Sequence, residues 1–139
     1  MIDLFAADAD LRALLARTRT IAVVGLSPNL QRPSHGVASY LQAHGFRIVP
    51  VNPNAAEVLG EKSFPTLSEA ARHARIDMVD VFRRNEDVLP VMQQAIAIGA
   101  PAVWLQLGVR HDEAKALGEA AGIVVVQDRC IMVEHRKAF

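Results

Sequence analysis

The chain has 139 residues, 51% of them apolar, and its 15 basic side chains equal its 15 acidic ones. This length favours one domain with a sizeable core, and the apolar share argues against long disordered stretches. The charge balance argues against nucleic-acid binding, the single cysteine against a disulfide framework, and the lack of about 18 consecutive apolar residues against a membrane span.

The acidic residues near the N-terminus do not suit a signal peptide, so we expect a cytoplasmic protein. The expected organisation is a single domain over residues 1–139, with a leading helix within 1–18 and a core over 19–139. In chain order, the first expected elements are a helix over 9–17, a strand over 21–24, a helix over 34–44 and a strand over 48–51. The continuous apolar run 21–24 is typical of a buried parallel strand, and Ser34 is a good N-cap for the helix after it.

Strand and helix patterns also alternate in the second half of the chain. The expected elements are a short strand over 62–64, a helix over 67–74, a strand over 76–82, a helix over 85–98, a strand over 102–107, a helix over 112–121, a strand over 123–126 and a terminal turn or helix over 129–137. Asn85 can cap the fourth of the expected helices, although Pro90 suggests that its regular part begins later.

This alternation predicts an α/β fold: a Rossmann-like, doubly wound, mostly parallel sheet of about five to six strands with helices on both faces. In such sheets, ligands bind outside the carboxyl ends of the strands, where the strand order reverses. The loops expected at that edge are 25–34, 52–54, 82–84 and 106–110. We therefore look for function in these four loops.

The first loop follows a strand, where a dinucleotide-binding fingerprint would lie. The pattern G-x-G-x-x-G is incomplete, because Ser27 and Leu30 stand at the second and third glycine positions after Gly25. A phosphate can still contact backbone N–H groups and the positive end of the next helix, and Arg32 adds charge. The alternative is a simple strand-to-helix turn. A serine hydrolase is disfavoured, because Pro28 lacks the N–H that an oxyanion hole needs.

The second strand ends without a carboxylate. Nicotinamide dinucleotides usually require an Asp or Glu there for the ribose hydroxyls, but this chain has Asn52 followed by Pro53. The residues therefore favour, over NAD in its usual position, either a nucleotide that carries phosphate on its ribose or a ligand bound in a different pose.

The two remaining loops carry polar side chains directly after strands. Arginines such as Arg83 and Arg84 suit an anionic ligand, or they pair with nearby carboxylates. We expect ligand binding for Arg83 and pairing for Arg84. Phe82 is predicted either in the core or against a ligand. Gln106 faces the cleft and needs partners if buried, and Gly108 allows close approach.

The sequence indicates neither catalytic residues nor a metal site. No pair of carboxylates is placed for acid–base work, since Asp80 stands alone late in a strand, and the histidines show no ligand spacing. For Cys130 two interpretations stay open: a small buried residue, or an accessible thiol near the start of a helix.

Six segments, taken together and in this order, carry a family resemblance: 24–29, 32–34, 50–53, 80–84, 104–109 and 128–135. They resemble the YccU-like group of small single-domain CoA-binding proteins. They are also similar to the CoA-binding domain of the succinyl-CoA synthetase alpha subunit and of ADP-forming acyl-CoA synthetases. The resemblance covers roughly residues 10–137.

The resemblance implies a Rossmann-like domain that binds coenzyme A, or an acyl-CoA, without a known reaction. It implies that the phosphates are bordered by Gly25, Ser27, Arg32, Pro33 and Ser34, that the adenosine lies by Asn52, Pro53 and Asn54, and that the pantetheine arm is flanked by Phe82, Arg83, Gln106 and Gly108. It also implies that many relatives carry Lys or Arg where this chain has Asn54.

We therefore expect a non-enzymatic coenzyme A-binding protein, regulatory in role or a partner subunit of an acyl-CoA enzyme, that binds neither nucleic acid nor membrane. A homo-oligomer is expected only from the general frequency of such assemblies. The alternative is an NAD(P)-dependent or other nucleotide-binding oxidoreductase domain. A third hypothesis is a mixed disulfide between Cys130 and the thiol of coenzyme A.

Overall fold

The computed structural model describes residues 7–139, so the predicted leading segment is seen only in part and residues 1–6 lie outside the described residues. In chain order the elements are α1 (Ala7–Ala16), β1 (Thr20–Val24), α2 (Pro33–Ala43), β2 (Arg47–Val51), β3 (Glu57–Val58), β4 (Glu61–Lys62), α3 (Leu67–His73), β5 (Met78–Val81), the 3-10 turn η1 (Asn85–Asp87), α4 (Val88–Ala97), β6 (Ala102–Leu105), α5 (Asp112–Ala120), β7 (Val124–Val126) and α6 (Ile131–Ala138).

The main sheet has five strands in the order β2-β1-β5-β6-β7, and every neighbouring pair is parallel. The chain runs outward from β1 to β2, then returns to place β5 on the other side of β1. The strand order therefore reverses between β1 and β5, which is where a ligand site is expected in an open α/β sheet. The predicted Rossmann-like parallel fold is confirmed.

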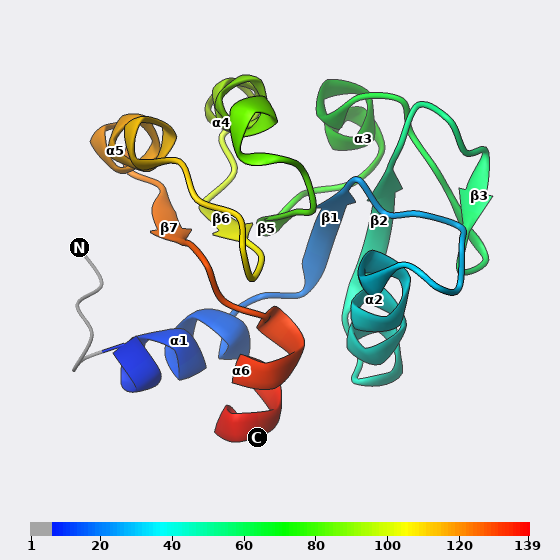
Figure 1. The fold of residues 1–139 in the computed structure, drawn as a ribbon, viewed down its shortest axis with the longest axis horizontal. Coiled ribbons are helices and arrows are strands. Elements are labelled where there is room, and N and C mark those ends of the chain that lie inside the picture. The colour runs from blue at the N-terminus through cyan, green and yellow to red at the C-terminus, as the bar shows by residue number, and fades with distance from the viewer. Residues whose placement is uncertain (1–6) are drawn as a thin grey trace.

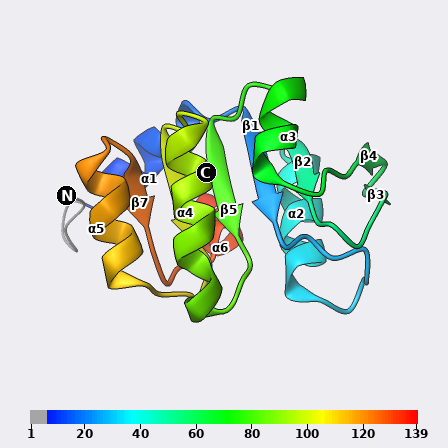
Figure 2. The same ribbon diagram turned by 90° about the horizontal axis from the view of Figure 1, so that it is seen from above.

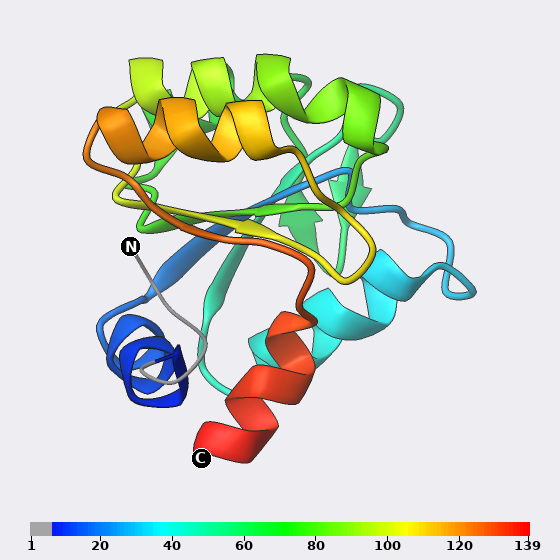
Figure 3. The same cartoon turned by 60° about the vertical axis from the view of Figure 1, so that its left-hand side comes forward.

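Helices cover both faces of this sheet. α3, α4 and α5 lie over one face, and α1, α2 and α6 lie over the other (Figures 1 and 2). Figure 3 shows α4 and α5 side by side, with α6 below the opposite face, where it contacts both α1 and α2. Within the described range, no helix has the length and apolar character needed to cross a membrane.

Alternate residues of each strand build two separate cores. Ile21 and Val23 of β1 pack toward α1, α2 and α6, whereas Ala22 and Val24 pack toward α3, α4 and α5. This follows from the period of two along a strand. It also explains why the central strands read as uninterrupted apolar runs, since both of their faces are covered.

The short strand predicted over 62–64 does not join the main sheet. Instead, β3 and β4 form a separate antiparallel hairpin, whose turn carries Leu59 and Gly60 at positive φ. Phe64 makes only an isolated bridge to Val51. The prediction missed this hairpin because its turn has no strong turn dipeptide, and β6 likewise ends at Leu105 rather than at residue 107.

Candidate functional site

Gly25 begins the loop at the point where β1 and β5 separate. Its N–H donates to the carbonyl of Val51 at 2.9 Å, and the Phe82 N–H donates to the carbonyl of Val24 at 2.9 Å. Its φ is +87°, and a Cβ at this position would collide with the carbonyl oxygen of Phe82. Only glycine combines this backbone conformation with so close an approach.

Polar side chains of the first loop fold it onto the start of α2. The hydroxyl of Ser34 accepts from the Ser27 N–H at 3.1 Å, the Ser27 hydroxyl accepts from the Asn29 N–H at 3.1 Å, and the Asn29 carbonyl accepts from the Arg32 N–H at 3.0 Å. The predicted N-cap role of Ser34 is therefore wrong. The helix begins at Pro33, with Arg32 at the N-cap position, because proline suits the first helical position and the Ser34 hydroxyl is used by the loop.

A cavity of about 360 Å³ lies at this N-terminus of α2. The smaller cavity, as we call it, is lined by Gly25, Ser27, Arg32, Pro33, Ser34 and Phe82. All five first-loop residues predicted to border phosphates thus meet around one volume. The first-turn N–H groups of a helix carry partial positive charge and favour anions, so this cavity has the electrostatics of a phosphate site.

A second, larger cavity of about 700 Å³ shares two walls, Pro33 and Phe82, with the first. Its apolar lining includes Val37, Leu107 and Val109. The polar and charged residues at its walls are Arg83, Arg84, Asp87, Gln106 and Cys130. The two adjoining cavities therefore combine a polar cavity at a helix N-terminus with a larger, more apolar one.

The two arginines after β5 have different surroundings. Arg84 Nε lies 3.3 Å from Glu86 and 3.1 Å from Asp87, so it forms the carboxylate pairs expected of it. Arg83 makes no ion pair with any side chain that the structure describes. Its Nη1 lies over the first loop, 3.4 Å from the position that a Cβ on Gly25 would take. The unpaired guanidinium thus lies beside the smaller cavity while it also lines the larger one.

Two buried side chains, Trp104 in β6 and Gln106 directly after it, hold the part of the larger cavity's wall that contains Cys130. Trp104 Nε1 donates to the carbonyl of Arg129 at 2.8 Å, and Gln106 Oε1 accepts from the Ile131 N–H at 3.2 Å. These bonds fix the residues on both sides of Cys130, which is half-buried at the N-cap of α6. Of the two interpretations of Cys130, the structure favours the accessible thiol.

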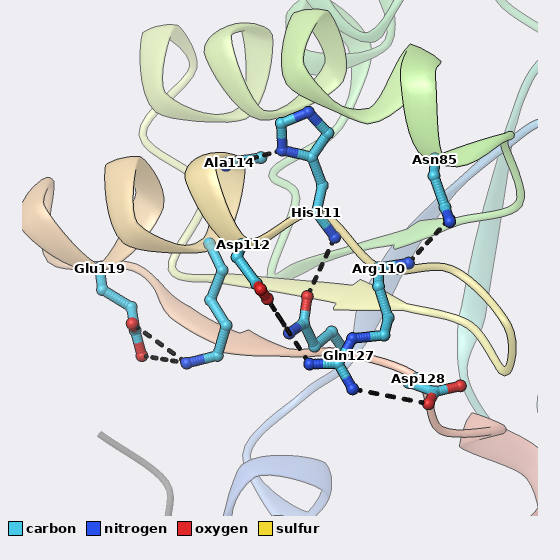
Figure 4. A network of polar contacts seen from close by, with 9 residues as sticks. Asn85, Arg110, His111, Asp112, Ala114, Glu119, Gln127 and Asp128 are labelled. Atoms are coloured by element: carbon cyan, nitrogen blue, oxygen red, sulfur yellow. Dashed lines mark hydrogen bonds and ion pairs between the residues drawn. The ribbon is translucent and has the colours of Figure 1, made fainter.

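A network of polar contacts connects the loops that follow β6 and β7 (Figure 4). Asp128, at positive φ, accepts from the Gly108 N–H at 2.8 Å and pairs with Arg110 at 3.9 Å. Arg110 also pairs with Asp112 at 3.5 Å, and its N–H donates to Asn85 Oδ1 at 2.9 Å. The network fixes the loops after β6 and β7 to each other. Gly108 belongs to this network through its N–H and lines neither cavity.

The loop after β2 lies beside the first loop but outside both cavities. Asn52 Nδ2 donates to the carbonyl of Leu26 at 3.0 Å, and its Oδ1 accepts from the Asn54 N–H at 2.8 Å. The Asn52 amide therefore ties two loops together. Pro53 and Asn54 are exposed next to it.

Six residues of the larger cavity were not among the predicted site residues: Val37, Arg84, Asp87, Leu107, Val109 and Cys130. No sequence signal singled out Leu107, because the residues predicted it inside a strand, whereas the structure places it 70% exposed after the end of β6. Val37 lies one helical turn after Pro33, so it shares a face with the start of α2. The others depend on how the loops pack.

Asp80 has no part in either cavity. It is fully buried in β5 between Val23 and Trp104, and neither carboxyl oxygen has a hydrogen-bond partner among the described residues. Burial raises the pKa of this carboxyl well above its ordinary value.

Comparisons with known proteins match most of the chain. A family described as "CoA binding domain" matches residues 19–136. The uncharacterized protein YneT of Bacillus subtilis (strain 168) is 39% identical over 127 residues, which cover 91% of this chain and 93% of that protein. The matched range 19–136 includes every residue that lines the two cavities.

Two solved structures are similar over nearly their whole length. A hypothetical protein from Pyrococcus horikoshii OT3 is 37% identical with a TM-score of 0.90, covering 94% of this chain and 91% of that one. A protein of Thermus thermophilus is 38% identical with a TM-score of 0.87, covering 95% of this chain and 98% of that one.

Proposed function

Because the chain belongs to the CoA-binding domain family, we propose that it binds coenzyme A in the two adjoining cavities at the carboxyl edge of its sheet. The observation that carries the proposal is the pairing of a polar cavity at a helix N-terminus with a larger, more apolar one across shared walls. Coenzyme A has the same two parts, since its phosphate-bearing nucleotide continues into a long uncharged arm that ends in a thiol.

The phosphates occupy the smaller cavity in this proposal. The first turn of α2 supplies N–H groups there, and Arg32 supplies an exposed positive charge. Arg83 approaches from the side of β5 and has no competing carboxylate among the described side chains. Guanidinium groups bind phosphate with two parallel hydrogen bonds, so both arginines contribute to the diphosphate in this arrangement.

The pantetheine arm occupies the larger cavity. Its volume of about 700 Å³ falls within the range of roughly 300–1,000 Å³ that small-molecule sites commonly have. Val37, Leu107 and Val109 supply apolar contacts for the methylene groups of the arm. The adenosine part extends toward the Asn52–Asn54 loop, which the Asn52 amide holds against the first loop.

We further propose that the protein binds coenzyme A without transforming it. Among the described residues that line the cavities, Asp87 is the only carboxylate, and Arg84 already pairs with it. A nicotinamide-dependent oxidoreductase is less favoured, because β2 is followed by Asn52 with its amide already engaged rather than by a carboxylate free for a ribose. A role as regulator or as partner of an acyl-CoA-using enzyme fits a binding protein of this kind.

The proposal is tested by calorimetric titration of the full chain with coenzyme A, dephospho-CoA, NAD and NADP. Binding of coenzyme A with no measurable binding of NAD or NADP is expected. Equal affinity for coenzyme A and dephospho-CoA would leave the diphosphate as the anchor, in line with an uncharged Asn54 in the loop after β2. Binding of NAD or NADP without coenzyme A would overturn the proposal.

Substitutions of three arginines locate the site. Arg32→Ala and Arg83→Ala are each expected to weaken coenzyme A binding by about 1–3 kcal/mol, the contribution of a hydrogen bond to a charged group, which is roughly five- to 150-fold in Kd. Arg47→Ala is the matched control, because Arg47 is exposed at the start of β2 and lines neither cavity, and it should change Kd much less. Unchanged affinity in both Arg32 and Arg83 variants would remove them from the site.

A further inference from the structure

One reactive group in the larger cavity has no role in simple binding. Cys130 is the single cysteine of the chain, it is half-buried, and it lines this cavity together with Phe82 and Gln106. From this geometry we infer that Cys130 forms a reversible mixed disulfide with the thiol end of coenzyme A. The inference rests on the proposed function, because it requires the pantetheine arm to enter the larger cavity.

An independent observation indicates a polar ligand in the same cavity. Gln106 is only 4% exposed, and its Oε1 accepts from the Ile131 N–H. Its Nε2 donates to no residue that the structure describes, yet it is not among the fully enclosed polar atoms that lack a partner. Gln106 lines the larger cavity, so a ligand acceptor in this cavity would satisfy a buried donor that otherwise lacks a partner.

The pantetheine arm supplies such an acceptor. It carries two amide groups, and the carbonyl of either can accept from Gln106 Nε2 while the methylene groups contact Val37 and Val109. Gln106 and Cys130 lie on the same wall, because Gln106 holds the residue that follows Cys130. An arm bound by the Gln106 amide is thereby directed toward the Cys130 thiol.

Cys130 is also held in place within the wall. Trp104 Nε1 donates to the carbonyl of the preceding residue, Arg129, and the N–H of the following residue, Ile131, donates to Gln106. The Arg129 side chain lies 3.5 Å from Glu134. Because the backbone on both sides of Cys130 is held by hydrogen bonds, the thiol loses little conformational freedom when it reacts. This favours reaction with a disulfide that is already bound in the cavity.

The reaction is thiol–disulfide exchange with the symmetrical disulfide of coenzyme A as the oxidant. The Cys130 thiolate attacks one sulfur of that disulfide, so a bond forms between Cys130 Sγ and this sulfur. The sulfur–sulfur bond of the oxidant breaks, and the second coenzyme A leaves as a thiolate that takes a proton from solvent. Cys130 is oxidised, one coenzyme A is released in reduced form, and an added thiol reverses the step.

The experiment uses the reduced full chain and follows its intact mass over time after addition of coenzyme A disulfide. One coenzyme A adduct per chain is expected, removed by dithiothreitol and absent in Cys130→Ser. Serine is a good N-cap residue, so this variant should keep α6 folded. Glutathione disulfide should react about tenfold more slowly, because it lacks the nucleotide that raises the effective concentration at Cys130.

A relocated thiol provides the matched control. In the double variant Cys130→Ser/Ser68→Cys, the cysteine lies on the exposed side of α3, over the face of the sheet opposite α6. This thiol should react with both disulfides at the same rate. The same equality for Cys130 itself would overturn the inference, since it would describe an ordinary exposed thiol.

Calorimetry with dethio-CoA, which has the arm but no thiol, separates the two proposals. Binding of dethio-CoA together with no adduct from coenzyme A disulfide would overturn the disulfide inference and leave the proposed function standing. Absence of dethio-CoA binding would overturn both. Binding together with a rapid, thiol-reversible adduct at Cys130 would support both.

Discussion

The geometry of the smaller cavity depends strongly on Gly25. It combines a φ of +87° with a backbone approach from Phe82 that leaves no room for a Cβ. The carbonyl of Phe82 can come this close only because a hydrogen atom stands where other residues carry a side chain. The same closeness lets Arg83, the next residue, place its guanidinium over the first loop.

We predict that Gly25→Ala destabilises the fold and also weakens coenzyme A binding. Backbone strain at positive φ alone costs about 1–3 kcal/mol, and the collision with Phe82 adds to it. Gly122→Ala is the matched control, because Gly122 has the same φ of +87° with open space around its Cβ position. Urea denaturation of both variants measures the difference, and equal losses of unfolding free energy would contradict the role of the collision.

Residue type alone distinguishes poorly between residues that bind ligand and residues that brace loops. The sequence predicted opposite roles for Arg83 and Arg84, and Arg84 does pair with carboxylates. Asn52 and Gly108 were expected beside the ligand, yet the structure shows both engaged with neighbouring loops. Their site roles therefore stay predictions.

At the scale of elements, β5 places a carboxyl group, which is unfavourable to bury, at the centre of the sheet. Its Asp80 is fully buried with no hydrogen-bond partner among the described residues. In the folded chain, burial raises the pKa of Asp80 well above 3.8, so the carboxyl keeps its proton after the unfolded chain has released it. Between these two pKa values the unfolded state binds fewer protons, so stability falls as pH rises through that window.

We predict that Asp80→Asn raises stability at neutral pH and flattens its pH dependence. The wild-type slope reaches about 1.4 kcal/mol per pH unit for one such group, and the amide cannot ionise. Melting temperatures of both proteins from about pH 4 to pH 8 should diverge as pH rises.

Asp77→Asn serves as the contrasting variant for that series. The Asp77 carboxylate accepts from the backbone N–H groups of Arg19 and Thr20 at 3.1 and 2.9 Å. Its neutralisation should weaken these charge-assisted bonds and lower stability instead. Parallel pH slopes for the wild type and Asp80→Asn would show that Asp80 does not titrate differently on folding.

The start of α2 shows how a tertiary contact overrides a local signal. Serine is a common N-cap residue, but the Ser34 hydroxyl accepts from the Ser27 N–H across the loop. The helix consequently begins at Pro33, with Arg32 at the N-cap position. Sequence reasoning found the helix and its loop, whereas the boundary depended on a partner seven residues away.

At the scale of the whole molecule, the alternation of buried apolar runs with amphipathic segments was sufficient to predict the fold. The strands of the main sheet are covered on both faces, so their apolar runs give a strong signal, which in β5 is interrupted by Asp80. The β3–β4 hairpin gave none, because only Val58 in it is buried. The larger cavity could be predicted only in part, since it joins α2, the loops after β5 and β6, and the start of α6.

The position of β1 between β2 and β5 has a consequence for folding kinetics. The first loop is held by bonds to Val51 and Phe82, so it takes shape only after β1 has paired with two strands that are distant in the sequence. Parallel pairings of this kind form slowly, because long chain segments must be ordered first. If the loop forms after the folding transition state, its contacts stabilise the native state and slow unfolding, but they do not change the folding rate.

We therefore expect coenzyme A to slow unfolding and to leave the refolding rate unchanged. Stopped-flow measurements across urea concentrations, with and without the ligand, separate the two rates. Faster refolding in its presence would mean that the first loop is already formed at the barrier. An unchanged refolding rate would mean that the ligand binds only after the sheet is complete. In that case coenzyme A stabilises the folded chain by lengthening its lifetime.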